Sequence, residues 1–347
     1  TCPQSRYAEG GALPDGALVK PISGWAKGLF CPRRVALYGA SETPGKVGHS
    51  FLRNLTDPKS GFSGEVLPVH PSLSSVMGLP AVSGLGEARL QADLAIIVTP
   101  PAAVPAAIRD CAEARIPVAV IVTSGFAEAG ADGAALQRQM LEVAHRGNVR
   151  IVGPNCFGVI SPAVGLNASM ALGMPRQGGI GLFTQSGAYG MAAFTRSQED
   201  GIGFSRIIAA GNKADLDETD VLQAFASDPE TRVIAMLLES ISDGRRFFEA
   251  ARQITPSKPV IVMKSGRGVA GKRAAESHTA SLSSDFVVAR AALRQAGVRV
   301  VEDGGTLLDL ASAMDKQPEL KGNRVAIITN SGGTGVELAD LFEARGI

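Results

Sequence analysis

Residues 34–55, RVALYGASETPGKVGHSFLRNL, decide the fold expected for the first part of the chain. A short continuous apolar run, Val35–Tyr38, precedes a glycine-rich turn and then apolar residues at helical spacing. Continuous rather than alternating apolar residues are typical of strands buried on both faces of a parallel sheet. The stretch therefore predicts a strand, a turn and a helix of an α/β fold.

The same order of strand and helix recurs along the chain. Helical spacing marks Pro101–Ala114 and Ala134–Ala144. Repeated strand-then-helix order predicts doubly wound parallel-sheet domains. Further strands are predicted at Leu94–Thr99, Val118–Thr123, Gly179–Phe183, Val233–Leu238, Val260–Met263 and Arg324–Thr329.

Breaks in this pattern suggest the domain boundaries. Residues 1–30 contain little periodic pattern, and GPNCFGVISP at 153–162 interrupts the alternation of strands and helices. A polar stretch at 315–323 precedes one more predicted strand and helix, which cannot bury themselves alone. We expect a lead-in at 1–29, a first domain at 30–153, a second at 154–318 and the start of an incomplete third at 319–347.

Composition narrows the class of protein. The 347 residues are 45% hydrophobic and 19% charged, which argues against disorder. Because Lys+Arg 34 and Asp+Glu 33 give a net charge of +1, nothing favours a nucleic-acid partner. No apolar run reaches the roughly 20 residues of a membrane span, and no secretory signal is visible. We therefore expect a cytoplasmic protein without nucleic-acid or membrane partners.

The four cysteines are scattered, with no paired spacing. We therefore expect neither a disulfide framework nor a metal site, which is typical of a reducing compartment. Cys156 has no histidine at a motif spacing, so we do not expect it to be a nucleophile.

Several predicted strands end in turns rich in Gly and Ser. Ligands bind at the carboxyl ends of strands in open parallel sheets, where helix N-termini favour anions. The repetition predicts a phosphate-bearing ligand. The turns are LYGAS, IVTSGF, LFTQSGA, VMKSGRG and ITNSGGTG.

The first of these turns has a spacing of its own. Gly39, Gly45 and Gly48 follow G-x5-G-x2-G rather than the GxGxxG of nicotinamide enzymes. Val47 after Lys46 excludes the GK[ST] of a P-loop. The second strand, GEVLPVHP, ends without the acidic residue that would bind a dinucleotide ribose. The turn therefore favours a nucleotide or CoA over a nicotinamide dehydrogenase.

Several segments, in this order, resemble the NDP-forming acyl-CoA synthetases, the superfamily of succinyl-CoA synthetase and ADP-forming acetyl-CoA synthetase. The resemblance covers about residues 30–347. It departs from the family at Ser72, where relatives often have Lys, and at Ala280, where they usually have Gly. The segments are GASETPGKVG, GFAEAG, IVGPNCFGVISP, LFTQSGAYG, AAGNKADLDETD, MLLESISDGRRF, VMKSGRG and ESHTASL.

The resemblance implies tandem Rossmann-like and flavodoxin-like domains, the first binding CoA. The segment around Asn212, Lys213 and Asp215 would shape the acyl or phosphate pocket, and Cys156 would lie beside the CoA thiol. The residues that would hold or border CoA are Gly39, Ala40, Ser41, Gly45, Lys46, Val47, Gly48, Thr99, Pro100 and Pro101.

The resemblance also implies catalytic residues. His278 in ESHTASL would be phosphorylated during turnover, since a neutral imidazole is nucleophilic at cytosolic pH. Glu239 would accept a hydrogen bond from one imidazole nitrogen and leave the other free to react. Backbone N–H groups of Ser186, Gly187 and Ala188 would receive the phosphate.

The reaction implied is that of an ADP-forming acid–CoA ligase, which converts a carboxylic acid, CoA and ATP to acyl-CoA, ADP and phosphate. ATP and Mg²⁺ would be held mainly by an ATP-grasp domain or subunit not seen in this sequence, in a homo- or hetero-oligomer. The alternative is a CoA-sensing regulatory module fused to another activity, such as a protein acetyltransferase. Retention of both His278 and Glu239 argues against that alternative.

Overall fold

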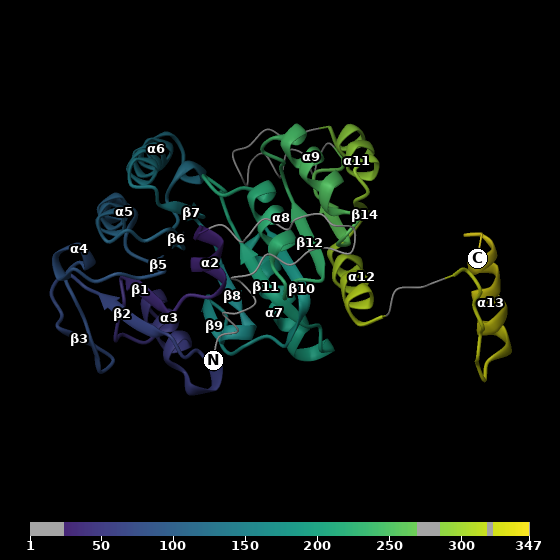
Figure 1. The fold of residues 1–347 in the computed structure, drawn as a ribbon, viewed down its shortest axis with the longest axis horizontal. Coiled ribbons are helices and arrows are strands. Elements are labelled where there is room, and N and C mark those ends of the chain that lie inside the picture. The colour runs from purple at the N-terminus through teal and green to yellow at the C-terminus, as the bar shows by residue number, and fades with distance from the viewer. Residues whose placement is uncertain (1–23, 269–284, 318–321, 347) are drawn as a thin grey trace. The chain divides into compact units, whose positions relative to one another are not determined.

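The computed structural model describes residues 24–268, 285–317 and 322–346 (Figure 1). The chain divides into two compact units, Thr1–Asp315 and Lys316–Ile347. The first unit contains two large sheets, and the second contains one described helix.

The first sheet is entirely parallel, with the strand order β2-β1-β5-β6-β7. Every residue of β5 and β6 is buried, which explains their continuous apolar sequences. The strands predicted near Val35, Leu94 and Val118 are confirmed. The strands are β1 (Arg34–Tyr38), β2 (Glu65–Val69), β5 (Leu94–Ile97), β6 (Val118–Ile121) and β7 (Arg150–Val152).

Helices connect these strands and begin at the ends where the strands finish. The α5 and α6 segments confirm the helical spacing expected from the sequence. The helices are α3 (Val47–Thr56), α4 (Leu85–Ala88), α5 (Val104–Glu113) and α6 (Ala131–Arg146). A small hairpin, β3 (Ser75–Val76) with β4 (Leu79–Pro80), and the 3₁₀ turns Pro58–Ser60, Pro101–Ala103 and Ala127–Ala129 complete this half.

The second sheet has the strand order β14-β13-β12-β10-β11-β8-β9. Strands β14 to β11 in this order are parallel, as predicted for Gly179–Phe183, Val233–Leu238 and Val260–Met263. The strands are β8 (Gly158–Ser161), β9 (Leu166–Ser169), β10 (Gln177–Thr184), β11 (Phe204–Ala209), β12 (Val233–Leu238), β13 (Val260–Lys264) and β14 (Arg299–Val301). The helices are α7 (Gly187–Asp200), α8 (Glu218–Ser227), α9 (Gly244–Ile254), α11 (Phe286–Gln295) and α12 (Gly304–Lys316), with the 3₁₀ turn Pro162–Val164.

One edge of the second sheet differs from the all-parallel expectation. The stretch 153–162, which we expected only to separate the sheets, contains β8, and β8 pairs antiparallel with β11 and with β9. Gly158 explains the turn into β8, because its φ of 118° suits glycine and an added Cβ would lie 2.1 Å from the Ala168 carbonyl oxygen.

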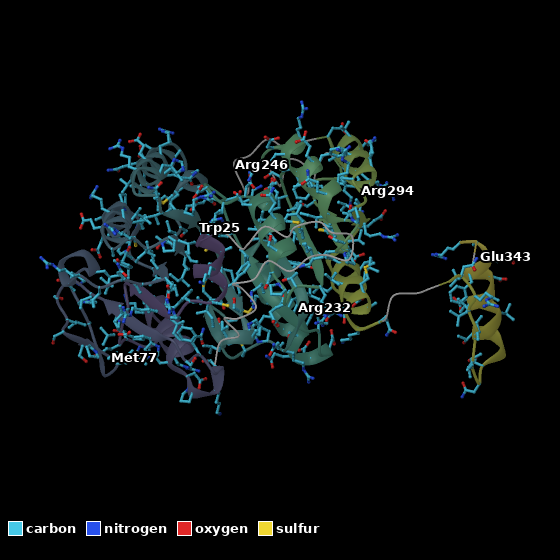
Figure 2. The ribbon with its side chains drawn as sticks, viewed as in Figure 1. Trp25, Met77, Arg232, Arg246, Arg294 and Glu343 are labelled. Carbon is cyan, nitrogen blue, oxygen red and sulfur yellow. The ribbon has the colours of Figure 1, made fainter. Side chains whose placement is uncertain are left out.

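The end of the expected lead-in is an ordered helix. Gly24–Phe30 forms α2, and its Ala26, Leu29 and Phe30 side chains are buried. The neighbouring Trp25, labelled in Figure 2, packs partly buried against the same apolar cluster. This helix was not predicted because it is short and contains two glycines, which are poor helix formers.

Phe30 contacts the second half of the unit. Its ring stacks on Phe225 of α8 with centroids 6.0 Å apart, and the Arg206 guanidinium lies 5.1 Å from its centroid. Arg206 is itself buried against Asp228, with Nε and Oδ2 3.4 Å apart. One apolar cluster therefore includes residues of both sheets.

A polar contact strengthens the same junction. The Asn54 side-chain amide on α3 donates to the carbonyl oxygens of Ser169, at 2.9 Å, and Ala171, at 2.7 Å. Both bonds are buried, so each is costly to lose. The two sheets are thus fixed relative to each other by packing and by hydrogen bonds.

The unit Lys316–Ile347 contains α13 (Gly332–Glu343). The strand predicted at Arg324–Thr329 is wrong, because these residues are exposed and form no regular structure. A strand needs a hydrogen-bonded neighbour, and the described residues 322–346 contain none. Among all described residues, no helix has the length and apolar character to cross a membrane.

We predict that Phe30→Ala lowers the free energy of unfolding by about 3–5 kcal/mol, since it leaves a cavity beside Phe225 and exposes Arg206. Urea unfolding followed by fluorescence measures the change. Leu73→Ala is the control, because Leu73 is 42% exposed and should change stability by less than about 0.5 kcal/mol. Equal effects of the two substitutions would contradict the role given to α2.

Candidate functional site

A cavity of about 640 Å³ opens at the carboxyl ends of the strands and is lined by residues from both sheets. Its position agrees with the general rule that ligands bind at these ends of open parallel sheets. From the first half come Lys46, Val47, Val98, Thr99, Pro100, Pro101, Val122, Thr123 and Ser124. From the second half come Asn155, Cys156, Phe157, Met170, Gln185, Gly187, Gly211 and Asn212.

The structure brings together many of the residues expected at the CoA site. Lys46, Val47, Thr99, Pro100 and Pro101 line the cavity directly. The other expected residues do not form the wall of the cavity; they belong to the turn between β1 and α3, except for Gly48, which is the second residue of α3. These are Gly39, Ala40, Ser41, Gly45 and Gly48.

Two glycines let this turn fold back tightly on itself. A Cβ on Gly48 would lie 1.9 Å from the Gly39 carbonyl oxygen, so only glycine fits there. Gly39 has a φ of 88°, and its own Cβ would lie 3.1 Å from the Thr99 backbone nitrogen. The close approach places the start of α3 beside the end of β5, and no side chain caps that start. The positive end of α3 therefore remains available to an anion.

A second helix N-terminus reaches the cavity from the other sheet. Gly187, the first residue of α7, lines the cavity, while Ala188 is exposed. The Ser186 hydroxyl caps the helix by accepting from the Tyr189 N–H at 3.3 Å, and the Ser186 N–H donates to the Thr184 hydroxyl at 3.0 Å. The cavity thus combines two helix N-termini with the Lys46 ammonium, an arrangement that suits anionic ligands.

Glu239 follows β12 and is 9% exposed. Its N–H and that of Ser240 both donate to the Gln185 side-chain oxygen, at 2.7 and 3.0 Å. The Gln185 amide in turn donates to the Ser240 hydroxyl at 3.2 Å. Gln185 lines the cavity, so the backbone of Glu239 is held by a side chain of the cavity wall. His278 lies outside the described residues, so its expected contact with Glu239 stays a prediction.

Gln185 is a residue that sequence reasoning missed. It stands inside LFTQSGAYG, which we expected to bind phosphate through backbone N–H groups alone. Its side chain faces the adjacent strand end, and β10 and β12 are neighbours in the sheet. Only a prediction of the strand order would have indicated this pairing.

The residues Asn212 and Asp215, which were expected to shape the pocket together, have different positions in the structure. Asn212 lines the cavity and donates to the Glu128 carboxylate and, at 3.3 Å, to Gln137. Burial alone would raise the pKa of Glu128, but hydrogen bonds from Asn212 and from the Gly125 and Phe126 N–H groups hold it below its ordinary value. Glu128 therefore stays ionised and fixes Asn212.

Asp215 of the same segment faces away from the cavity wall. Its carboxylate accepts from Arg150 at 2.9 Å and from the Ile151 N–H at 2.8 Å. Arg150 also donates to Asp220 at 3.3 Å, and Asp220 in turn accepts from Arg246, a residue labelled in Figure 2. Asp215 therefore joins β7 to the second half of the unit, in contrast to the pocket role expected for it.

Cys156 lines the cavity and is buried. Burial raises the pKa of its thiol to about 12, and the thiol donates to the Ile121 carbonyl at 3.2 Å. The thiol is therefore neutral at physiological pH, which supports a role without covalent chemistry. Among the described residues, no group of three or more His, Cys, Asp or Glu side chains could hold a metal ion.

Two domain families match this chain. A CoA binding domain matches residues 33–162, and a succinyl-CoA ligase like flavodoxin domain matches residues 177–314. These matches confirm the expected tandem of Rossmann-like and flavodoxin-like domains.

Curated relatives extend the similarity. The chain is 41% identical over 319 residues to acetate–CoA ligase [ADP-forming] I of Archaeoglobus fulgidus, covering 92% of this chain and 46% of that protein. It is 40% identical to the alpha subunit of acetate–CoA ligase [ADP-forming] II of Pyrococcus furiosus, covering 92% of this chain and 69% of the subunit. The chain thus spans about half of the first relative and about two thirds of the second.

A solved structure agrees. The dinucleotide forming acetyl-coenzyme A synthetase 1 of Ca. Korarchaeum cryptofilum, in complex with phosphate and ADP, superposes with a TM-score of 0.88 at 36% identity. The match covers 94% of this chain and 70% of that one.

We predict that Gly48→Ala weakens CoA binding by about tenfold or more, because the new methyl group must displace the Gly39 carbonyl and reshape the turn. Isothermal titration with CoA measures the affinity, and a melting curve reports the fold. Gly244→Ala is the control, since a Cβ at Gly244 meets nothing within 4 Å. Unchanged CoA affinity in Gly48→Ala would contradict the role in CoA binding expected for this tight turn.

We also predict that Cys156→Ala leaves the Kd for CoA within about threefold, because the neutral thiol adds no charge to the cavity; isothermal titration measures the affinity. Cys111→Ala is the matched control, because Cys111 is equally buried and lies off the cavity wall, and burial raises the pKa of its thiol to about 12 as well. A loss of CoA affinity by orders of magnitude in Cys156→Ala alone would instead assign the thiol a direct role in binding.

Proposed function

The chain belongs to the family of ADP-forming acid–CoA ligases, and we propose that it contributes the CoA-binding and histidine-bearing part of such an enzyme. The observation that carries the proposal is the shared cavity. Two helix N-termini, from α3 and α7, meet around one space large enough for a substrate, and Gln185 in the wall of that space holds the backbone of Glu239. CoA, an acid and phosphate all bring negative charge to that space.

The proposed reaction has three steps. The imidazole of His278 takes the γ-phosphoryl group of ATP, with a P–N bond forming as the bond to ADP breaks. A carboxylate oxygen of the acid then takes the phosphoryl group, which breaks the P–N bond and gives an acyl phosphate. The CoA thiol loses its proton and attacks the acyl carbon, so that a C–S bond forms and phosphate leaves.

The residues of this chain have separate roles in that scheme. The N-terminus of α3 and Lys46 hold CoA phosphates, with Thr99 bordering the ligand. The N-terminus of α7, at Ser186, Gly187 and Ala188, receives the transferred phosphate. Glu239 accepts a hydrogen bond from one nitrogen of His278, which leaves the other nitrogen as the nucleophile.

The substrates and partners follow from the relatives. Acetate and 4-hydroxybutyrate appear in the names of relatives 41% and 34% identical to this chain, which supports a small carboxylic acid. The Pyrococcus furiosus relative is named as an alpha subunit, which supports assembly with a further domain or subunit. That ATP-grasp part would bind ATP and Mg²⁺, within a homo- or hetero-oligomer in the cytoplasm.

We predict that the chain, assayed with its nucleotide-binding domain or subunit, becomes labelled by γ-³²P-ATP and Mg²⁺. The label should resist base, be lost in acid and disappear in His278→Ala. Glu239→Gln should slow labelling by about 10–100-fold, as expected for loss of a group that orients the reacting imidazole.

His145→Ala is the control, because this exposed histidine contacts Asp215 and not the cavity, and it should label at the unsubstituted rate. Absence of label with a folded nucleotide-binding part present would contradict the ligase mechanism. It would favour a CoA-sensing module instead.

A further inference from the structure

The turn that carries Glu239 is held at all four of its backbone polar groups. The N–H groups of Glu239 and Ser240 donate to Gln185, as described above. Their carbonyl oxygens accept from two lysine ammonium groups, Lys264 to Glu239 at 2.7 Å and Lys213 to Ser240 at 3.0 Å. The turn is therefore fixed by one amide side chain and two ammonium groups.

Lys264 is the last residue of β13 and is 1% exposed. It lies opposite Leu238 in the register of β12 and β13, directly before Glu239. Its ammonium also donates to the Ser265 carbonyl at 2.8 Å. One side chain therefore ties the turn after β12 to the turn after β13, from which the sequence continues to His278.

The two lysines differ in how their charge is balanced. Lys213 pairs with the buried carboxylate of Glu218. Within the described residues, Lys264 forms no such ion pair, and its bonds go to carbonyl oxygens. Burial and the nearby Lys213 lower the pKa of Lys264, whereas the Glu239 carboxylate raises it.

Packing alone does not require a charge at this place. A buried ammonium is costly to desolvate, and its hydrogen bonds to the Glu239 and Ser265 carbonyl oxygens offset part of that cost. What distinguishes Lys264 is that its buried charge lies near the Glu239 carboxylate.

We propose that Lys264 is a positioning residue for phosphoryl transfer, which fixes the turn of Glu239 and places a positive charge beside its carboxylate. The inference rests on the proposed function, because Glu239 acts on His278 there. Lys264 touches no substrate in this scheme and works through Glu239.

The chain offers a matched control on the same strand. Lys258 precedes β13 at its opposite end and donates in the same way to two carbonyl oxygens, those of Phe225 at 3.0 Å and Asp228 at 2.7 Å. Burial lowers its pKa to about 8. Lys258 thus reproduces the structural part of the arrangement away from the cavity.

The test compares Lys264→Met, Lys264→Arg and Lys258→Met in the complete enzyme with its nucleotide-binding part. The readouts are the rate of phosphohistidine formation from γ-³²P-ATP, the Kd for CoA and the melting temperature. We expect Lys264→Met to label about 10–100-fold more slowly with an unchanged Kd for CoA. Lys258→Met should melt earlier but label within about twofold of the unsubstituted enzyme, and Lys264→Arg should recover much of the rate.

The pH dependence of the labelling rate is a further measurement, and it should not change if Lys264 has a purely structural role. Because the pKa of Lys264 lies below its usual range, its ammonium is lost at a lower pH than that of an exposed lysine. The rate should therefore fall on the alkaline side, and Lys264→Arg should extend activity to higher pH. The charged groups on the neighbouring strand ends are Lys213 with Glu218, Glu239, and Glu302, which pairs with Arg267 at 3.2 Å. All of them remain in the variants.

Labelling of Lys264→Met within about twofold of Lys258→Met would overturn the proposal. So would a folded Lys264→Arg enzyme that labels as slowly as Lys264→Met. A label that persists in His278→Ala, or its absence from the unsubstituted enzyme, would overturn the proposed function and with it the role of Lys264.

Discussion

The packing of both sheets on one apolar cluster is the constraint on which the cavity depends. Phe30 lies between the sheets, stacked on Phe225 and covered by the Arg206 guanidinium. Asn54 adds buried hydrogen bonds to the same junction. Because each half contributes only one wall, a small shift between the sheets would open the cavity and separate the two helix N-termini. The apolar junction therefore sets the geometry in which anionic ligands could meet.

Around the cavity, many polar side chains form hydrogen bonds with backbone groups. The Gln185 side-chain oxygen accepts hydrogen bonds from two backbone N–H groups, and Lys264 and Lys213 donate to carbonyl oxygens. The Glu128 carboxylate accepts from backbone N–H groups and from the Asn212 side chain. Buried hydrogen bonds of this kind are costly to break, and they fix turns that have no regular secondary structure. Rigid turns are what a reaction between positioned groups requires.

The sequence alone predicted the buried strands well, because both faces of a parallel sheet are apolar and leave a continuous pattern at β5, β6, β12 and β13. It missed α2, whose stability comes from distant partners such as Phe225. It overpredicted a strand at Arg324–Thr329, where the apolar pattern lacks a neighbour. The expected CoA turn could be found from its glycines, since their spacing is local. Gln185 and Lys264 could not, because their importance follows from which strand ends lie side by side.

The two walls of the cavity belong to different sheets, and this has a consequence for how such a protein can change. The glycine-rich turn and Thr99 come from the first half, whereas Phe157 and Met170 come from the second. Substitutions in the second wall can alter the shape of the cavity around an acid without changing the turn expected to bind CoA. Evolution, or a directed library, can therefore vary which acid fits while the turn expected to bind CoA stays the same.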